Sequence, residues 1–208
     1  MKRRHRGRIS GASENPTNMY GKRSTKGNAY DLERARAKWS HRGSTRPPWS
    51  IDPGPGEESV WDYPRPPRLD PDRRLVRVIH GAIIIAESRR TIRVLETASP
   101  PTFYIPPSDV RIEFLVGGRG ASHCEWKGDA SYWSLRTDGA EIPNIGWSYG
   151  QPYSEFMAIQ GYSSFYPAKV ECYVGGERVQ PQPGGFYGGW ITREVLGPFK
   201  GEPGTGGW

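Results

Sequence analysis

The chain has 208 residues, a formal net charge of +7 and a mean hydropathy of −0.73, which suits one domain with polar tails. Its longest apolar run, Ala82–Ala86, is too short to span a membrane, and no apolar stretch follows the basic N-terminus. We therefore expect no membrane contact and a cytoplasmic location. Neither Cys124 nor Cys172 belongs to a C-x-x-C pair, which argues against a disulfide framework and a structural zinc site.

The composition predicts that the chain has a disordered part and an ordered part. The 27 Gly and 20 Pro approach a low-complexity composition, but disordered chains lack aromatic residues such as the 8 Trp and 11 Tyr found here. Residues 1–49 hold 13 basic and 3 acidic residues, a net charge of +10, whereas the remainder hold 16 and 19, a net charge of −3. Residues 1–38 are predicted to be a disordered basic arm. This arm either attracts nucleic acid weakly and without specificity or, as we favour, is a solvated tail.

Residues 39–57 are a Pro/Gly-rich linker that turns into structure by residue 67, and we call residues 39–67 the strap. Its prolines favour extended backbone. Trp39, Trp49, Trp61 and Tyr63 are too large and apolar to remain in water. We therefore expect the strap to lie on the folded body.

Short β-branched or alternating runs predict strands at residues 75–80, 82–88, 91–97, 102–105, 110–116, 131–135, 145–149, 165–166 and 170–174. Gly81 marks a hairpin between the first two, and residues 117–120 are predicted to be a loop. Ser154–Gln160 is predicted to be a short helix with Ser154 as its N-cap, and residues 31–38 to form at most a turn or two of helix. Because no βαβ alternation occurs, we expect a mainly β fold of antiparallel sheets with one or two short helices.

The C-terminal residues 181–208 combine nine glycines with bulky apolar side chains, including Trp190 and Phe199. Glycine permits tight turns, and the bulky side chains need a surface to cover. We expect a wrap that covers an open sheet edge, with a lid over a pocket as the alternative.

Six motifs follow one another through the body of the chain: ESVWDYPRPP (58–67), IRVLET (92–97), YIPPSDV (104–110), CEWKGDASYW (124–133), WSY (147–149) and GYSSFY (161–166). In order and spacing they resemble domain-of-unknown-function family 427, which also carries the label nucleotidyltransferase-like. The resemblance implies a β domain at residues 58–180 with a β-tent, or Mss4-like, arrangement of antiparallel sheets. Relatives in that fold class include zinc-binding domains with paired C-x-x-C knuckles, which this sequence lacks, so we predict no metal and no cofactor.

The candidate catalytic residues are Cys124 and Lys127. A lysine three residues from a cysteine favours the thiolate, which is the reactive form of the side chain. Lys127 could instead hold a phosphate or carboxylate. In the alternative without function, Cys124 is a small buried hydrophobic residue and Lys127 belongs to a structural ion pair.

A dense aromatic set with nearby charges predicts a cleft for a small planar or anionic molecule. Arg93 and Glu96 lie three apart on a predicted strand and face opposite sides, so one of them can face a cleft, although an inter-strand salt bridge is the alternative. The aromatic residues could equally form the core of the domain. The predicted ligand-binding residues are Trp61, Tyr63, Arg65, Arg93, Glu96, Tyr104, Lys127, Tyr132 and Trp147.

We therefore expect a domain that binds an unidentified small molecule. One alternative is an enzyme, acting by nucleotidyl transfer or through Cys124, and another is a structural interaction module recruited by the basic arm. Nucleotidyl transfer needs carboxylates that hold metal ions near the phosphates. The closest acidic pairs, Asp70/Asp72 and Asp109/Glu113, lie beside no nucleotide-binding turn, and the sequence has no P-loop.

Overall fold

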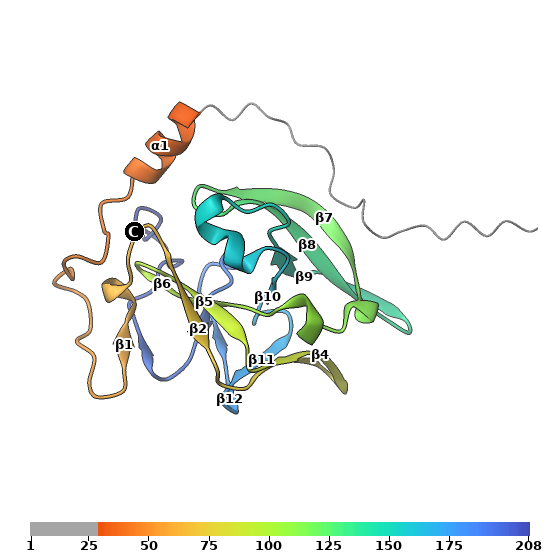
Figure 1. Ribbon diagram of the computed structural model, residues 1–208. Helices are drawn as coiled ribbons and strands as arrows, with labels where there is room; N and C mark the ends of the chain where they lie inside the picture. The colour runs from red at the N-terminus through yellow and green to blue at the C-terminus, as the bar shows by residue number, and fades with distance from the viewer. Residues whose placement is uncertain (1–28) are drawn as a thin grey trace, which may run out of the picture.

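The computed structural model describes residues 29–208, so most of the predicted basic arm, together with its expected disorder and attraction to nucleic acid, lies outside the described residues. The described chain begins with a short helix, α1 (Ala29–Ala37). It continues through the strap and into a body of β-strands (Figure 1).

Three antiparallel sheets form that body, which confirms the mainly β fold predicted from the sequence. The first contains, in spatial order, β10 (Ser163–Phe165), β9 (Ala140–Ser148), β8 (Gly128–Thr137) and β7 (Leu115–Cys124). The second contains β12 (Glu177–Arg178), β11 (Glu171–Val174), β3 (Val76–His80) and β4 (Ile83–Ser88). The third contains β2 (Arg68–Asp72), β5 (Thr91–Glu96) and β6 (Ser99–Tyr104).

Two short strand pairs attach the chain ends to this body. An antiparallel pair joins β13 (Gln180–Pro181) to β14 (Trp190–Ile191). A parallel pair joins β1 (Glu58–Ser59) to β15 (Val195–Leu196). The C-terminal wrap is therefore paired with the strap, and the C-terminus lies close to the strap in Figure 1.

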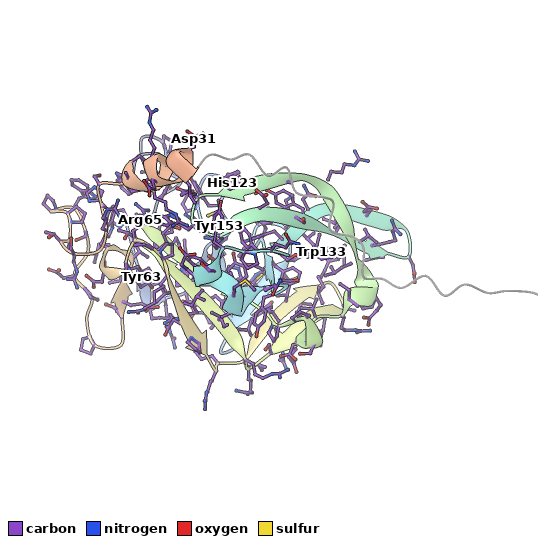
Figure 2. All side chains as sticks on the ribbon, turned by 45° about the horizontal axis from the view of Figure 1, so that its top comes forward. Asp31, Tyr63, Arg65, His123, Trp133 and Tyr153 are labelled. Atoms are coloured by element: carbon purple, nitrogen blue, oxygen red, sulfur yellow. The ribbon has the colours of Figure 1, made fainter. Side chains whose placement is uncertain are left out.

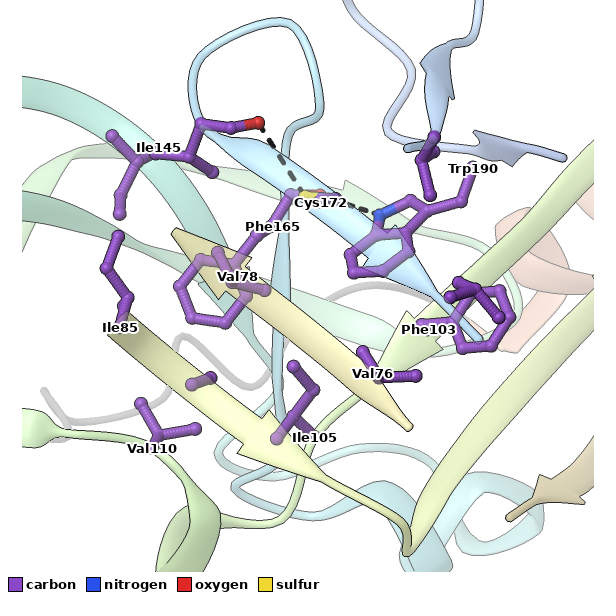
Figure 3. Packing of buried hydrophobic residues seen from close by; sticks show 14 of the residues in the cluster. Val76, Val78, Ile85, Phe103, Ile105, Val110, Ile145, Phe165, Cys172 and Trp190 are labelled. Carbon is purple, nitrogen blue, oxygen red and sulfur yellow. Dashed lines mark hydrogen bonds between the residues drawn. The ribbon is translucent and has the colours of Figure 1, made fainter. Parts of the chain in front are cut away.

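The main core lies between the first two sheets (Figure 3). Alternation along β3 buries Val76 and Val78, and the hairpin turns at Gly81, whose φ of +57° suits glycine. Trp190 of the wrap is fully buried beside them, stacks on Phe103 at 5.0 Å and donates its indole N–H to the carbonyl of Phe165 at 2.9 Å. The wrap therefore completes the core.

The strap lies on the body, as its aromatic residues predict. Trp39 and Trp61 are buried, while Trp49 is half exposed and stacks on Trp208 with ring centroids 6.2 Å apart. The indole N–H of Trp61 donates to the carbonyl of Pro198 at 3.1 Å. Within residues 29–208, no helix is long and apolar enough to cross a membrane.

Three local predictions were wrong. Residues 110–114 are not a strand, and only Leu115 and Val116 of the predicted run are extended, at the start of β7. The 3₁₀ turn η2 (Pro107–Asp109) precedes this stretch and η3 (Ile112–Phe114) occupies most of it, because two prolines precede it and remove backbone donors. The expected loop at 117–120 lies inside β7, where an added Cβ at Gly118 would lie 2.9 Å from the Cβ of Tyr132.

The third wrong prediction is the helix at Ser154–Gln160. The structure has a 3₁₀ segment, η4 (Ser154–Ile159), which breaks from helical geometry at Phe156. Its N-cap is Tyr153 rather than Ser154, without a side-chain capping bond. The segment is too short for its few hydrogen bonds to offset the cost of starting an α-helix.

Candidate functional site

A cavity of about 400 Å³ lies where β5 and β6 face the ends of β7, β8 and β9. Trp39 and residues of the C-terminal wrap form the rest of its wall. This volume is within the range of small-molecule sites. Aromatic side chains supply much of its wall, namely those of Tyr104, Tyr132, Trp147, Tyr149, Tyr166 and Tyr187.

Lys127 supplies a buried positive charge in this cavity. It ends the tight turn between β7 and β8, where Cys124 pairs with Gly128, and the φ of +94° at Gly128 suits only glycine well. Its side chain is 7% exposed, with the ammonium 5.8 Å from the ring centroid of Phe156 and 6.0 Å from that of Tyr149.

Burial by itself lowers the pKa of Lys127, but the electrostatic effects of Cys124, Tyr104 and Glu96 outweigh it and raise the pKa above its usual value. The lysine is therefore charged at neutral pH. Of these three neighbours only Glu96 is a carboxylate, and its oxygen already accepts a hydrogen bond from Arg65 at 3.2 Å.

The aromatic wall is fixed by hydrogen bonds. Trp147 Nε1 donates to the hydroxyl of Tyr104 at 3.1 Å, and the two rings meet edge to face. Burial raises the pKa of Tyr104 to about 12 and raises that of Tyr149 well above its ordinary value. Both phenols are therefore neutral hydrogen-bonding groups at physiological pH.

A second buried lysine, Lys200 of the C-terminal wrap, also lines the cavity. It is 4% exposed, and its ammonium lies 3.6 Å from the ring centroid of Trp39 and donates to a main-chain oxygen of Trp208 at 3.1 Å. Burial lowers the pKa of Lys200 to about 8; Arg65 and Lys38 add to this effect, whereas Glu96 and Glu125 oppose it.

The structure brings six of the residues predicted from the sequence to this cavity. They are Glu96, Tyr104, Cys124, Lys127, Tyr132 and Trp147. His123, which adjoins Cys124, also lines it; Figure 2 shows His123 near Tyr153, with their rings 6.3 Å apart between centroids.

Four other predicted residues do not line the cavity. Trp61 and Tyr63 pack in a separate apolar cluster, where the strap meets Leu95 and Ala98 of the body (Figure 2 labels Tyr63). Arg93 forms ion pairs with Glu58 and Asp70. The fourth, Arg65, is considered next.

Arg65 supports the cavity from behind. Its buried guanidinium pairs with Glu96, donates to the carbonyl of Thr97 at 2.7 Å, and lies 4.5 Å from the ring centroid of Trp39. It holds a wall residue from the side away from the cavity and also contacts the strap through the carbonyl of His41. Arg65 is therefore a positioning residue for Glu96 and Trp39.

The sequence did not lead us to Lys200, Tyr187 or the role of Trp39 in this cavity. Trp39 is separated from Glu125 by 86 residues, yet its indole N–H donates to that carboxylate at 2.7 Å. The feature of the sequence that could have pointed to Lys200 is the high density of Gly and aromatic residues around it, which indicates a segment that packs closely on the body.

The acidic residues considered for nucleotidyl transfer lie in ion pairs away from the cavity. Asp70 pairs with Arg93, and Asp109 pairs with Arg90 and accepts a hydrogen bond from Ser88. In the described part of the chain, no group of three or more His, Cys, Asp or Glu side chains is placed to hold a metal ion.

The fold and cavity define a class of protein: a mainly β domain whose sheets enclose an aromatic pocket containing a buried lysine. The chain belongs to the family described as Domain of unknown function (DUF427), whose model matches residues 68–176, just over half of the sequence. The family resemblance of the motifs is thus confirmed. No curated protein matches the chain.

Proposed function

We propose that the protein binds a small planar anion in this cavity. The observation that carries the proposal is Lys127, a buried lysine that stays charged inside an aromatic cavity and whose one carboxylate neighbour, Glu96, is already paired with Arg65. A buried charge is costly unless it is paired. An anionic ligand would supply the missing charge, and the rings of Tyr104 and Trp147 would contact its planar face.

The number of carboxylates near Lys127 supports an anion over a cation. Glu96 is held by Arg65, and Glu125 accepts the indole N–H of Trp39. The cavity wall therefore has more lysines than carboxylates that still lack a hydrogen-bond donor from the protein. A charge-assisted hydrogen bond contributes about 1.5–3 kcal/mol, which corresponds to at least about tenfold in affinity.

The test compares anions with their neutral counterparts. AMP, pyridoxine 5′-phosphate and benzoate would be titrated beside adenosine, pyridoxine and benzamide, with tryptophan fluorescence and calorimetry as readouts. At least one anion should bind about tenfold more tightly than its neutral counterpart. The preference should disappear in Lys127→Met and persist in Lys169→Met, since Lys169 is exposed and outside the cavity. Equal binding within every pair would overturn the proposal.

Thiol chemistry is a second candidate function. It is favoured because Cys124 lines the same cavity as Lys127 and helps to raise the pKa of that lysine. Cys172, by contrast, is buried in the main core, and burial raises its pKa well above the usual value. Iodoacetamide at neutral pH should then modify Cys124 and spare Cys172, and the bound anion should protect Cys124. If iodoacetamide modified Cys124 no faster than Cys172, thiol chemistry would be ruled out as a function of this cavity.

Nucleotidyl transfer, the activity suggested by the family label, receives no support from the acidic pairs, which are engaged with arginines outside the cavity. The cytoplasmic location stays a prediction.

A further inference from the structure

The contacts along one wall of the cavity give it a long direction. The charge of Lys127 acts on the hydroxyl of Tyr104, and that hydroxyl accepts the indole N–H of Trp147 at 3.1 Å. The opposite edge of the same indole, at Cζ3 and Cη2, lies against Gly188 of the C-terminal wrap. The wall therefore leads from a buried cation at one end to the wrap at the other.

The wrap end of this wall carries two aromatic side chains, Phe186 and Tyr187, in the loop between β13 and β14. Both line the cavity, and their rings meet edge to face with centroids 5.3 Å apart. Phe186 is 67% exposed, the highest value among the large hydrophobic side chains of residues 29–208. None of the other large hydrophobic side chains exposed in that part of the chain lines this cavity. The most exposed of them thus lies at the cavity's edge.

The backbone fixes the base of this loop. The N–H of Gln182 donates to the carbonyl of Gly189 at 3.1 Å, and the N–H of Gly189 donates to the side-chain oxygen of Gln182 at 3.0 Å. Gly184 lies so close to Gly201 that an added Cβ would be 2.5 Å from the carbonyl oxygen of Gly201. The N–H of Phe186 donates to the carbonyl of Gly184 at 2.8 Å. The loop therefore places the phenyl ring from an anchored base.

A ligand with its anionic group at Lys127 would extend along Trp147 and bring its far end to Phe186. An exposed phenyl ring gains free energy when a second apolar surface covers it. Aromatic rings gain further from stacked or edge-to-face contact. A planar ring at the far end of the ligand would supply both.

We propose that Phe186 is a specificity-determining residue of this cavity, which covers the planar ring of a ligand whose anionic group is held at Lys127. The inference rests on the proposed anion binding, because the charge at Lys127 decides which end of the ligand reaches the wrap. The ligand class is then an elongated molecule with an anionic group at one end and a planar ring at the other, as in an aryl or nucleoside monophosphate. Lys127 recognises the charge and Phe186 the ring.

The experiment compares anions that carry a ring with anions that lack one. Full-length protein is titrated by calorimetry with AMP beside ribose 5-phosphate, pyridoxine 5′-phosphate beside methyl phosphate, and benzoate beside acetate. Phe186→Ala should weaken at least one anion with a ring by about fivefold or more, the effect of losing one aromatic stacking contact. It should leave the ringless partner of that anion unchanged.

Two variants control this comparison. Phe186→Tyr keeps a planar ring and should bind like the unaltered protein. Ile112→Ala removes another exposed apolar side chain, which lies outside the cavity, and should also bind normally. Equal affinity of Phe186→Ala and the unaltered protein for all three anions with a ring would overturn the inference.

Thermal unfolding separates ligand contact from a structural role. Because Phe186 is exposed, Phe186→Ala should melt within about 2 °C of the unaltered protein. A large fall in melting temperature, with equal loss of binding for anions with and without a ring, would show that Phe186 supports the wall and does not recognise the ring. That result would also overturn the inference.

Adenosine and Lys127→Met separate this inference from the proposed function. If AMP binds more tightly than adenosine but equally well to Phe186→Ala, ring recognition by Phe186 is refuted and anion binding survives. If Phe186→Ala weakens AMP and adenosine equally and Lys127→Met weakens neither, the ring contact stands and the anion preference fails. If none of the anions or neutral compounds binds, both proposals fail.

Discussion

Gly188 provides a direct test of how the C-terminal wrap forms the cavity wall. A Cβ at this position would lie 2.6 Å from Cζ3 of Trp147 and closer still to Cη2, where ordinary contact begins at 3.4 Å. The indole must therefore move by at least 0.8 Å in Gly188→Ala, or the wrap must lift away. Trp147 is buried, bonded to Tyr104 and packed on Tyr166 at 4.5 Å, so the open direction is into the cavity.

Forced overpacking of this kind costs about 1–3 kcal/mol, or roughly 2–4 °C in melting temperature for each kcal/mol in a domain of this size. The matched control is Gly206→Ala, since Gly206 lines the same cavity but an added Cβ there meets no atom within 4 Å. Urea unfolding followed by tryptophan fluorescence gives the free energy, and pyridoxine 5′-phosphate titration gives the loss of binding. Equal stability and equal binding in the two variants would refute this picture of the wall.

Three further predictions concern the supports of the cavity and the core. Arg65→Met should lower the free energy of unfolding by about 3 kcal/mol because it leaves Glu96 unpaired, whereas Arg111→Met, at an exposed ion pair, should change it by less than about 1 kcal/mol in the same urea titration. The raised pKa of Tyr104 means that the unfolded chain loses this proton first, so stability should fall between pH 10 and about 12, and more steeply than in Tyr104→Phe. Trp190→Ala should cost about 3–5 kcal/mol in thermal unfolding, as expected for removal of a buried aromatic side chain.

The parts of the fold that follow from local pattern were predictable. The hairpin of β3 and β4 shows why: alternating burial and a glycine turn are both local properties of residues 76–88. Residues 110–114 alternate in the same way, yet they make only a single bridge, from Val110 to Ala86, in which the backbone N–H of Arg111 donates to the carbonyl of Ile85, and the chain then turns. That hydrogen bond depends on a partner 26 residues away, which no local period can indicate.

The same limit applies to the cavity. Cys124, Lys127 and Trp147 were identifiable because they lie within short motifs of one β domain. Lys200 reaches the cavity only because its backbone N–H donates to the carbonyl of Ala98 at 2.7 Å, across 102 residues of chain. Arg93 and Glu96 face opposite sides of their strand, as their spacing predicts. The spacing alone did not indicate which of the two sides would face the cavity.

Two parts of the chain form the cavity wall, and each part contributes one of its two buried lysines. Lys127 lies within residues 68–176, the part matched by the family model, together with Tyr104 and Trp147. Lys200 and Trp39 lie outside that part, in the wrap and the strap. The charge that would hold an anion thus belongs to the family domain, whereas Trp39 and the second buried lysine of the cavity wall are added by flanking segments.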